Sequence, residues 1–504
     1  MDNHTFLLAF LIFLAHFGAP TYATNPSLCT QTPYPELCNS LVNTTPQTTS
    51  LVEINLSDLR DTSLRATLAQ AQNTLNLIEN MNLSSFNDLA KSAWTDCLEL
   101  YQDTVYQLNR SVGSKSNNEQ TWLSAAIANE QTCRNGFLDF NLSSQLQSLP
   151  FMSSDFTKFL SNSLAINKAN IMASSSMSLA KQNKNRRLLS LGHDDEFPEW
   201  VSFGDRKLLQ SSTKLADIVV AQDGSGNYKT ISEGLAAAAK QRTSSGTNKR
   251  FVIYVKKGIY KENVEIMRSM KNLMLIGDGI DAAVVTGNRN VQDGSTTFRS
   301  ATFAVALRSS SDLSIFYQCS FKGYQDTLYV YSQRQFYRDC DIYGTTDFIF
   351  GDSATVIQNS NIYIRKLMSD QKITVVTAQG RNNPNENTGI VIHNSRVTLA
   401  GSGYRGYLGR PWREYSRTVY MKCRIDGGID PEGWMPWNGN FGLSTLYYGE
   451  YMNTGGGAST SGRVKWPGYH VITSAAEAGK FSVGKFLAGD SWIPATGVPC
   501  TSGL

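Results

Sequence analysis

The sequence lacks the features of a membrane protein, a disordered chain or a nucleic-acid-binding protein. It contains a single long hydrophobic run and its mean hydropathy is −0.28, so it is not a protein that crosses the membrane several times. Charged residues make up only 17% of it and hydrophobic residues 41%, too many for a disordered chain. No helix-turn-helix, RNA-recognition or zinc-finger pattern is present, so we expect no nucleic-acid partner. Three of the five histidines, His4, His16 and His193, lie in the leader and linker segments, so no Ser-His-Asp triad is expected.

The length and the charge distribution indicate more than one domain. At about 150 residues per domain, 504 residues correspond to two to four domains. Residues 1–209 hold 14 Lys and Arg against 19 Asp and Glu, a net charge of −5. Residues 210–504 hold 32 against 23, a net charge of +9, and the two values add to the +4 of the chain. This pattern predicts an acidic domain that complements a basic one, and the 39 glycines favour a β-rich body.

The first 24 residues are predicted to be a secretory signal peptide. The apolar run Phe6–Phe17 is shorter than the ~20 residues of a membrane span, and Thr21-Tyr22-Ala23 resembles a cleavage site. Because no Lys or Arg precedes the run, a buried helix or a membrane anchor is the alternative. The eight cysteines fit an oxidising route. Five glycosylation sequons lie in the acidic part, at Asn43, Asn55, Asn82, Asn109 and Asn141.

Residues 25–180 show the periodicity of helices. Apolar residues recur every three or four positions, as in Leu64, Leu68, Ala71, Leu75 and Ile78, in Trp94, Cys97, Leu98 and Tyr101, and in Trp122, Ala125 and Ala126. Cys29 and Cys38 are close enough in sequence to join a short hairpin, and Cys97 and Cys133 lie on two different predicted helices. No histidine accompanies them, so we expect no zinc site. The region is predicted to be a small helical bundle held by disulfides.

Residues 181–213 interrupt this pattern and are predicted to be a processing linker. Arg186-Arg187-Leu-Leu is repeated as Arg206-Lys207-Leu-Leu, and an acidic patch lies between them. An ordinary charged linker would look similar. In a secreted chain, however, paired basic residues in a polar segment are good cleavage sites. We therefore expect a subtilisin-like processing protease to act here.

From residue 214 onward, short apolar runs alternate with Gly, Asn, Asp and Ser, as is typical of strands. A triplet of a small, a polar and an apolar residue begins at Cys319, Cys340, Ser360, Ser395 and Cys423. The first intervals are 21 and 20 residues and the later ones are 35 and 28, which is the spacing of a solenoid with loops of variable length. We predict an all-β right-handed parallel β-helix, with a β-sandwich as the alternative.

Two aspartates inside this repeat are candidate catalytic groups. Asp326, in Gly-Tyr-Gln-Asp-Thr-Leu, and Asp347, in Gly-Thr-Thr-Asp-Phe-Ile-Phe-Gly, are 21 residues apart, one coil of the predicted solenoid. Neighbouring carboxyls titrate separately, which suits a nucleophile beside a general acid. The apolar neighbours of Asp347 would raise its pKa, so a cation is needed to keep it ionised. The alternative is a pair of polar residues in an ordinary solenoid ladder.

The segment Leu408-Gly-Arg-Pro-Trp412 provides the candidate cation. Arg410 can hold a carboxylate with two hydrogen bonds, and Trp412 offers a flat face to a sugar ring. A proline-fixed turn with a surface arginine is the alternative.

Taken together, these three segments closely resemble the motifs of plant pectin methylesterases, and Gly258-Ile-Tyr-Lys-Glu262 matches a further one. The helical region resembles the pectin methylesterase inhibitor domain with its four cysteines. The resemblance implies a type I precursor with a four-helix-bundle pro-domain. Its expected parts are the signal peptide (1–24), the inhibitor-like pro-domain (25–180), the processing linker (181–213) and the esterase domain (214–504).

The resemblance also implies a role for each candidate residue. Asp347 attacks the ester carbonyl, Asp326 acts as general acid and then base, and Arg410 orients and ionises Asp347. Gln325 stabilises the oxyanion, and Thr297 and Trp412 contact the galacturonan chain. No cofactor or metal is required.

One segment departs from the family pattern. Phe303, in Phe-Ala-Val-Ala-Leu, stands where the family has a glutamine that is a second oxyanion donor. The sequence before it reads as if about one coil were missing. The first interpretation is therefore a pectinesterase of reduced activity, and the alternative is a catalytically impaired pectin-binding or inhibitor-like protein.

The expected reaction converts methyl-esterified polygalacturonate and water to pectate and methanol outside the plant cell, in the wall. A pectate lyase or a polygalacturonase on the same fold is the rival within enzymes. Besides pectin and the processing protease, a proteinaceous inhibitor is an expected partner class, and we expect a monomer with no stable membrane anchor after signal removal.

Overall fold

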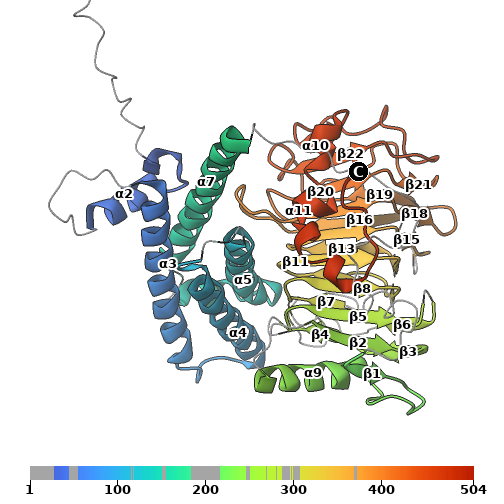
Figure 1. Ribbon diagram of the computed structural model, residues 1–504, viewed down its shortest axis with the longest axis horizontal. Helices are drawn as coiled ribbons and strands as arrows, with labels where there is room; N and C mark the ends of the chain where they lie inside the picture. Colours follow the sequence, from blue (N-terminus) through green and yellow to red (C-terminus); the bar gives the residue numbers. More distant parts are fainter. Residues whose placement is uncertain are drawn as a thin grey trace, which may run out of the picture.

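The computed structural model describes residues 28–44, 55–114, 116, 118–149, 152, 155–182, 216–245, 250–267, 270–279, 281–286, 296, 298, 307–367 and 372–504. Within these ranges a group of helices lies beside a stack of strands (Figure 1). The predicted signal peptide, both dibasic linker motifs, Thr297 and Phe303 lie outside the described residues.

The N-terminal part consists of helices, as the periodicity predicted. Four long helices form the bundle, in which α3 packs on α4 and α7, and α5 packs on the same two. The bounds are η2 (Leu28–Gln31), α2 (Pro35–Thr44), α3 (Leu56–Glu79), α4 (Asp88–Ser111), α5 (Glu119–Asp139), α6 (Ser143–Ser148) and α7 (Phe156–Gln182). The side-chain oxygens of Asn55 and Asn87 cap α3 and α4 by accepting a hydrogen bond from a backbone N–H of the first turn.

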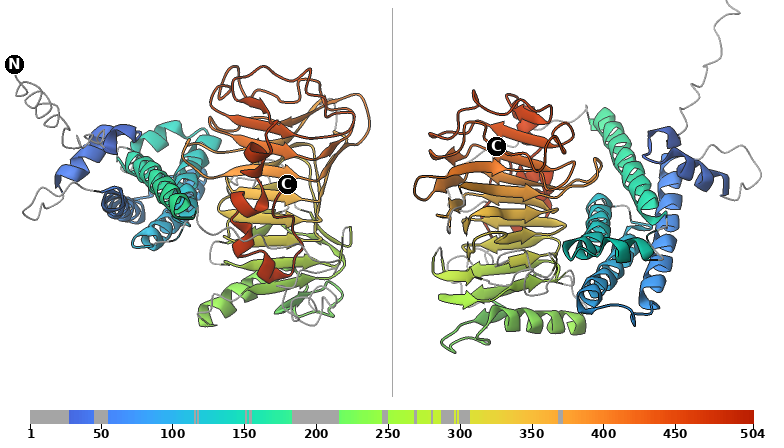
Figure 2. Two further views of the ribbon diagram at one scale, coloured as in Figure 1. Left: turned by 45° about the horizontal axis from the view of Figure 1, so that its top comes forward. Right: turned by 180° about the vertical axis from the view of Figure 1, so that it is seen from behind.

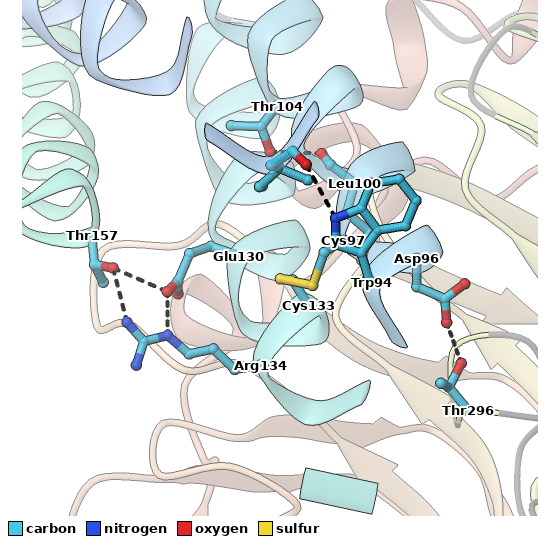
Figure 3. The surroundings of a disulfide bond; sticks show 11 residues. Trp94, Asp96, Cys97, Leu100, Thr104, Glu130, Cys133, Arg134, Thr157 and Thr296 are labelled. Atoms are coloured by element: carbon cyan, nitrogen blue, oxygen red, sulfur yellow. Dashed lines mark hydrogen bonds and ion pairs between the residues drawn. A yellow bond between two sulfur atoms is a disulfide. The ribbon is translucent and has the colours of Figure 1, made fainter. Parts of the chain in front are cut away.

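Disulfides hold the bundle together as predicted. Cys29–Cys38 closes the short N-terminal hairpin, and Cys97–Cys133 joins α4 to α5. Figure 3 shows that the second disulfide lies between helices whose buried faces meet. The four sequon residues with described side chains, Asn55, Asn82, Asn109 and Asn141, are all exposed, as glycosylation requires.

The C-terminal part is a parallel β-helix. Its described strands form three sheets in which each strand pairs with strands one coil away. The ten-stranded sheet contains β1 (Ile218–Val220), β2 (Phe251–Val255), β5 (Leu273–Gly277), β8 (Ser314–Tyr317), β11 (Arg334–Arg338), β14 (Ala354–Gln358), β17 (Gly389–His393), β20 (Arg417–Met421), β22 (Tyr447–Tyr451) and β23 (Tyr469–Val471). The seven-stranded sheet contains β3 (Gly258–Lys261), β6 (Ala283–Thr286), β9 (Ser320–Lys322), β12 (Asp341–Gly344), β15 (Asn361–Ile364), β18 (Arg396–Leu399) and β21 (Arg424–Ile425). The six-stranded sheet contains β4 (Val264–Ile266), β7 (Leu307–Ser309), β10 (Leu328–Val330), β13 (Thr346–Gly351), β16 (Ile373–Gln379) and β19 (Arg405–Gly409).

The predicted triplet repeat marks one sheet. Its five copies run into β9, β12, β15, β18 and β21, which are consecutive neighbours in the seven-stranded sheet. The apolar third residue of each triplet is buried inside the coils, and Phe321, Ile342 and Ile362 belong to one continuous core. The repeat therefore arises because every coil must place an apolar side chain at the same place in the interior.

The coils on either side of the segment around Phe303 pair directly. β5 pairs with β8, and β4 pairs with β7. The paired residues Leu275 and Phe316 are both buried in the interior. The described ladders thus run through this region without a gap, and the apolar faces of the neighbouring coils cover each other.

Short helices cover the end and one side of the β-helix. In Figure 1, α9 (Ile231–Ser245) lies across the end of the stack next to β1. The last segment, with α10 (Ala475–Gly479), α11 (Val483–Phe486), η5 (Gly489–Ser491) and η6 (Pro494–Thr496), packs Phe481 and Leu487 on the ten-stranded sheet. The cysteines of the β-helix, Cys319, Cys340, Cys423 and Cys500, are unpaired. Within the described ranges, no helix combines the length and the apolar character that a bilayer span requires.

Candidate active site

The two aspartates lie on neighbouring coils, as their spacing predicted. Asp347 belongs to β13, and Asp326 comes two residues before β10, which pairs with β13. The backbone N–H of Asp326 donates a hydrogen bond of 3.1 Å to the carbonyl oxygen of Thr346. Both side chains line one cavity of about 280 Å³. The one-coil register therefore places both carboxyls in the same cavity.

Both aspartates have left-handed backbone conformations. The φ angle is +56° at Asp326 and +50° at Asp347. Residues with a β-carbon adopt this region at a cost of about 1–3 kcal/mol, and such residues concentrate at functional sites. Asparagine and aspartate tolerate it best among them, so the turn itself favours these residue types. The conformation is shared by both positions because they occupy the same corner of consecutive coils.

Arg410 holds the carboxylate of Asp347 with a fork of hydrogen bonds. Nε donates to Oδ1 at 2.9 Å and to Oδ2 at 3.1 Å, and Nη2 donates to Oδ2 at 2.5 Å. The backbone N–H of Arg410 donates to Thr377 O at 2.9 Å, which fixes the residue directly after β19. The guanidinium also lies over the ring of Trp437, with Cζ 4.4 Å from the ring centre. The sequence-predicted cation thus lies at its expected position.

Burial has a larger effect than Arg410 on the pKa of Asp347. The residue is only 4% exposed, and loss of hydration raises the pKa of its carboxyl, while the hydrogen bonds and the charge of Arg410 lower it. The net result is a pKa raised above the ordinary value. Arg410 therefore orients the carboxylate and offsets part of the effect of burial on its pKa.

The other predicted residues lie around the same cavity. Gln325 and Trp412 line it and are half-buried. Trp412 is held against Phe350, with ring centres 6.0 Å apart, and contacts Gly380. Thr297 lies outside the described residues. On either side of it, Thr296 hydrogen-bonds to Asp96 of α4 (Figure 3), and the ring of Phe298 lies 5.2 Å from that of Tyr331.

Residues of the helical domain complete the cavity. Asn135 and Asp139, at the end of α5, line it together with Asp326 and Asp347. Beneath them Tyr329, Phe350 and Ala378 occupy matching positions on β10, β13 and β16, and all three are buried in one apolar cluster with helical residues. Both views of Figure 2 show the bundle beside this side of the strand stack. The helical domain therefore covers the cavity.

Hydrogen bonds between the two domains surround the covered cavity. Tyr331 OH donates to Asn129 Oδ1 at 2.8 Å, and Arg334 donates to Asn118 Oδ1 at 2.8 Å. A loop of residues 381–387, here called the docking loop, makes most of the others. They join Asn382 to Gln131, Asn383 to Ser161, Asn385 to Gln120, and Asn387 to Thr121 and Ser124.

Sequence reasoning missed six residues of the cavity. Asn135 and Asp139 belong to α5, and the β-helix supplies Phe350, Ala378, Arg413 and Trp437. Arg413 directly follows Trp412, so a cation beside a predicted sugar-binding ring was an available signal. The α5 residues had no such signal, because their place depends on how two domains pack.

The arrangement suits acyl transfer. One carboxyl is held in place by an arginine and a second lies on the next coil in the same cavity, which meets the geometric requirement for a nucleophile beside a general acid. Gln325 adds a side-chain amide that can donate to an oxyanion.

Comparison with known proteins gives consistent matches over both parts of the chain. A family model described as pectinesterase matches residues 217–306 and 302–490, and one described as plant invertase/pectin methylesterase inhibitor matches residues 25–166. The probable pectinesterase/pectinesterase inhibitor 6 of Arabidopsis thaliana is 49% identical, covering 99% of this chain and 96% of its own. Pectinesterase 2 of Citrus sinensis is 46% identical, covering 95% and 94%. The solved pectin methylesterase from carrot is 49% identical with a TM-score of 0.54, and covers 58% of this chain and all of its own.

The match to the pectinesterase model is divided in this chain. The pectinesterase model matches in two pieces that meet at residues 302–306, around Phe303. The alignment with the Arabidopsis relative runs over 546 positions, whereas this chain has 504 residues, so at least 42 positions (546 less 504) have no counterpart here.

Proposed function

The chain belongs to the pectinesterase family, and we propose that it is the precursor of a secreted enzyme that hydrolyses methyl esters of cell-wall pectin with Asp347 as nucleophile. The predicted resemblance to a type I precursor is confirmed, and so are the β-helix and the helical pro-domain. The observation that carries the residue assignment is the fork of Arg410 on Asp347 in the cavity that Asp326 also lines.

The first half of the proposed reaction forms an acyl-enzyme. A carboxylate oxygen of Asp347 attacks the ester carbonyl carbon, and the resulting oxyanion accepts a hydrogen bond from Gln325. The bond from that carbon to the methoxy oxygen then breaks. Asp326, protonated at this stage, donates its proton so that methanol leaves. The galacturonyl group remains joined to Asp347 as an anhydride.

The second half returns the enzyme to its starting state. Asp326, now a carboxylate, takes one proton from a water molecule as the water oxygen attacks the same carbonyl carbon. The anhydride bond breaks, Asp347 leaves as a carboxylate, and the new galacturonic acid loses the second proton of the water to solvent. Thr297 and Trp412 are proposed to hold the neighbouring sugars.

The direct test is methanol release from methyl-esterified pectin by the full chain after its linker has been cut. Methanol without new reducing ends or unsaturated products supports the esterase. An unsaturated product indicates a lyase, new reducing ends indicate a polygalacturonase, and either result without methanol overturns the proposal. Pectin binding without any product supports the non-catalytic alternative.

We also propose the predicted domain bounds, the secretion and the maturation. The residues 181–213 connect the covering domain to the esterase domain, so cleavage at Arg186-Arg187 or Arg206-Lys207 frees the helical domain for release. Because Asn135 and Asp139 line the cavity, the uncut chain is expected to be inactive. Replacing both dibasic motifs should leave the domain attached, impair release to the wall and keep methanol production low. Normal cleavage and secretion of that variant would contradict this account.

The gap at Phe303 supports a reduced rate. Loss of one oxyanion donor costs about 10²–10³ in rate, and Phe303 cannot replace the hydrogen bonds of an amide. Inserting a family-like coil that ends in glutamine should therefore raise methanol release more than about tenfold. If the chain as it stands is already as fast as the insertion variant, Gln325 and backbone donors suffice.

A further inference from the structure

Two of the unpaired cysteines lie on neighbouring coils of the β-helix. Cys319 and Cys340 directly precede β9 and β12, and the first residues of these strands, Ser320 and Asp341, are paired. The backbone N–H of Asp341 donates a hydrogen bond of 3.0 Å to the carbonyl oxygen of Cys319. The two cysteines therefore occupy the same position on consecutive coils, 21 residues apart in the sequence.

Their thiol groups are in contact in the interior of the β-helix. Cys319 is 6% exposed, Cys340 is fully buried, and both belong to one continuous core. The sulfur of Cys340 donates a hydrogen bond of 3.5 Å to the carbonyl oxygen of Phe316, which lies on the coil of Cys319. Burial, and after it a hydrogen bond with the thiol of Cys319, raises the pKa of the Cys340 thiol well above its ordinary value.

The spacing of the coils suits a covalent bond between the two sulfur atoms. Neighbouring parallel strands lie about 4.8 Å apart, and cysteines joined by a disulfide have α-carbons about 4.4–6.8 Å apart. Side chains at matching positions of parallel strands also point the same way, so neither sulfur is directed away from the other. We propose that Cys319 and Cys340 form a disulfide in the secreted protein.

This bond would join the two coils that carry the candidate catalytic groups. Asp326 follows Cys319 by seven residues, and Asp347 follows Cys340 by seven residues. A covalent link at the same position of both coils keeps the two aspartates in their one-coil register.

The oxidant is a disulfide of the secretory compartment, carried by an oxidoreductase or by oxidised glutathione. The thiolate of one cysteine attacks that disulfide, and the thiolate of the other then displaces the mixed disulfide. The two thiols together lose two protons and two electrons as the S–S bond forms, and the oxidant is reduced to two thiols. Because the thiolate is the reacting form and burial disfavours it, the exchange takes place before the coils close.

Cys423 occupies a corresponding position but has no thiol on the coil before it. The triplet of that coil begins with Ser395, and the strands that follow Ser395 and Cys423 are paired. The sulfur of Cys423 donates instead to the carbonyl oxygen of Ile392 at 3.2 Å. It therefore stays a thiol and provides the matched control.

The first experiment counts the thiols of the full chain, produced in a eukaryotic secretory pathway. The chain is unfolded, alkylated without reduction and analysed by mass and by its linked peptides. Four of the eight cysteines form the helical-domain disulfides, so we expect two alkylated cysteines, Cys423 and Cys500, and one peptide pair joined through Cys319 and Cys340. Cys423→Ser should leave one alkylated cysteine and the same peptide pair. Four alkylated cysteines with both helical-domain disulfides present overturn the inference.

The inference rests on the proposed secretion, so the chain is also made with a proven secretion leader in place of residues 1–24. If only this version leaves the cell and contains the Cys319–Cys340 peptide pair, the predicted signal peptide fails and the disulfide stands. If both versions are secreted without that pair, the disulfide fails and the secretion stands.

The second experiment measures what the bond contributes to the fold. The double variant Cys319→Ser/Cys340→Ser keeps a small polar residue at both positions, as Ser360 and Ser395 already do on later coils. Its urea midpoint should fall by about 0.5 M or more relative to the wild type, because the unfolded chain is no longer constrained. Cys423→Ser should lower the midpoint less. An equal fall in both variants overturns the stabilising link between the two coils.

Discussion

Arg463 and Glu450 form a buried ion pair in the last coils of the β-helix, and Arg410 and Asp347 form another in the cavity. Both pairs use two nitrogens of the arginine, with distances of 2.7 and 3.1 Å in the first pair and 2.5 to 3.1 Å in the second. The side chains of the first pair are each 2% exposed, whereas that of Arg410 is 21% exposed.

The difference lies in what else touches each carboxylate. Glu450 also accepts hydrogen bonds from Trp434 at 3.2 Å and Tyr469 at 3.1 Å, and Arg463 donates to the carbonyls of Pro431 and Gly457. This pair is a closed network. Asp347 has its arginine on one side and the cavity on the other, and its pKa is raised because burial outweighs that arginine. The first pair is enclosed by the fold, whereas the second presents a carboxylate to the cavity, as the proposed nucleophile requires.

The strongest test of this contrast is Asp347→Asn. Methanol release should fall about 10⁴-fold or more, because an amide cannot act as the nucleophile. The free energy of unfolding should change little, because the lost carboxylate was unfavourably buried and Arg410 still reaches water. Methanol assays and urea unfolding on the same protein measure both quantities. Substantial activity in a variant verified by mass as not deamidated would remove Asp347 from this role.

The opposite result is expected for Glu450→Gln. Removing one charge of a closed buried pair leaves Arg463 without a counter-ion and should cost about 3–5 kcal/mol of unfolding free energy. The methanol rate per folded molecule should stay within about twofold, because the pair lies outside the cavity. A large loss of rate with intact stability would show that the two pairs are not separated as described.

The part of the molecule that could be predicted from sequence is the part built by repetition. The triplets that begin at Cys319 and Cys340 fall on neighbouring strands because each coil repeats the same interior position. The same spacing predicted that Asp326 lies beside the strand of Asp347. Arg410 could be predicted because a buried carboxylate needs a nearby cation to remain ionised.

Residues placed by packing between domains could not be predicted in this way. Asn135 and Asp139 lie on a helix whose pattern reveals a buried face but not the surface that it meets. Trp437 lies in the irregular segment between β21 and β22, where no copy of the triplet fixes its register. The raised pKa of Asp347 depends on how completely the helical domain and the β-helix exclude water, which sequence spacing does not encode.

A smaller effect is expected when each arginine is changed to lysine. Arg410→Lys keeps the charge but loses the fork on Asp347, which should lower methanol release roughly 10- to 100-fold. Arg463→Lys should leave the rate unchanged and lower stability, because the carbonyls of Pro431 and Gly457 lose donors. Near-normal kinetics in Arg410→Lys would mean that a point charge suffices at Asp347.

A third kind of buried carboxylate extends the comparison. Asp352 and Glu386 hydrogen-bond to each other, and burial raises the pKa of Asp352 to about 6 and that of Glu386 above its ordinary value. Glu386 Oε2 accepts the backbone N–H groups of Asn382 and Asn383, but no donor in the described residues reaches its buried Oε1. The hydrogen-bonding requirement of the two carboxyls is therefore met when they share one proton. The pair fixes the docking loop from within.

Among the described residues, the charged side chains that act on this pair are cations. Arg381, Arg413 and Arg417 act on the pair, and Lys168 of α7 acts on Arg381 and Arg417. Their attraction lowers the two pKa values but does not overcome burial. Because both folded-state pKa values are raised, the pair stabilises the fold fully below the unfolded pKa near 4, and this stabilisation is lost as the pH rises through about 6.

Glu386→Gln should remove this pH dependence and is the smallest effect predicted. Its amide supplies the shared hydrogen at every pH, so the variant should be about 1–2 kcal/mol more stable than the wild type at pH 7 and equal to it near pH 4.5. Urea unfolding of the full chain between pH 4.5 and 7 measures the difference in unfolding free energy between the variant and the wild type. The other titrating groups are the same in both proteins, so their contributions cancel. Glu414→Gln, at an exposed position, removes one carboxyl without touching the pair and is the control. If the unfolding free energies of wild type and Glu386→Gln change with pH in the same way, no proton is shared between the two carboxyls. The docking loop would then be held by Arg381 and its backbone contacts alone.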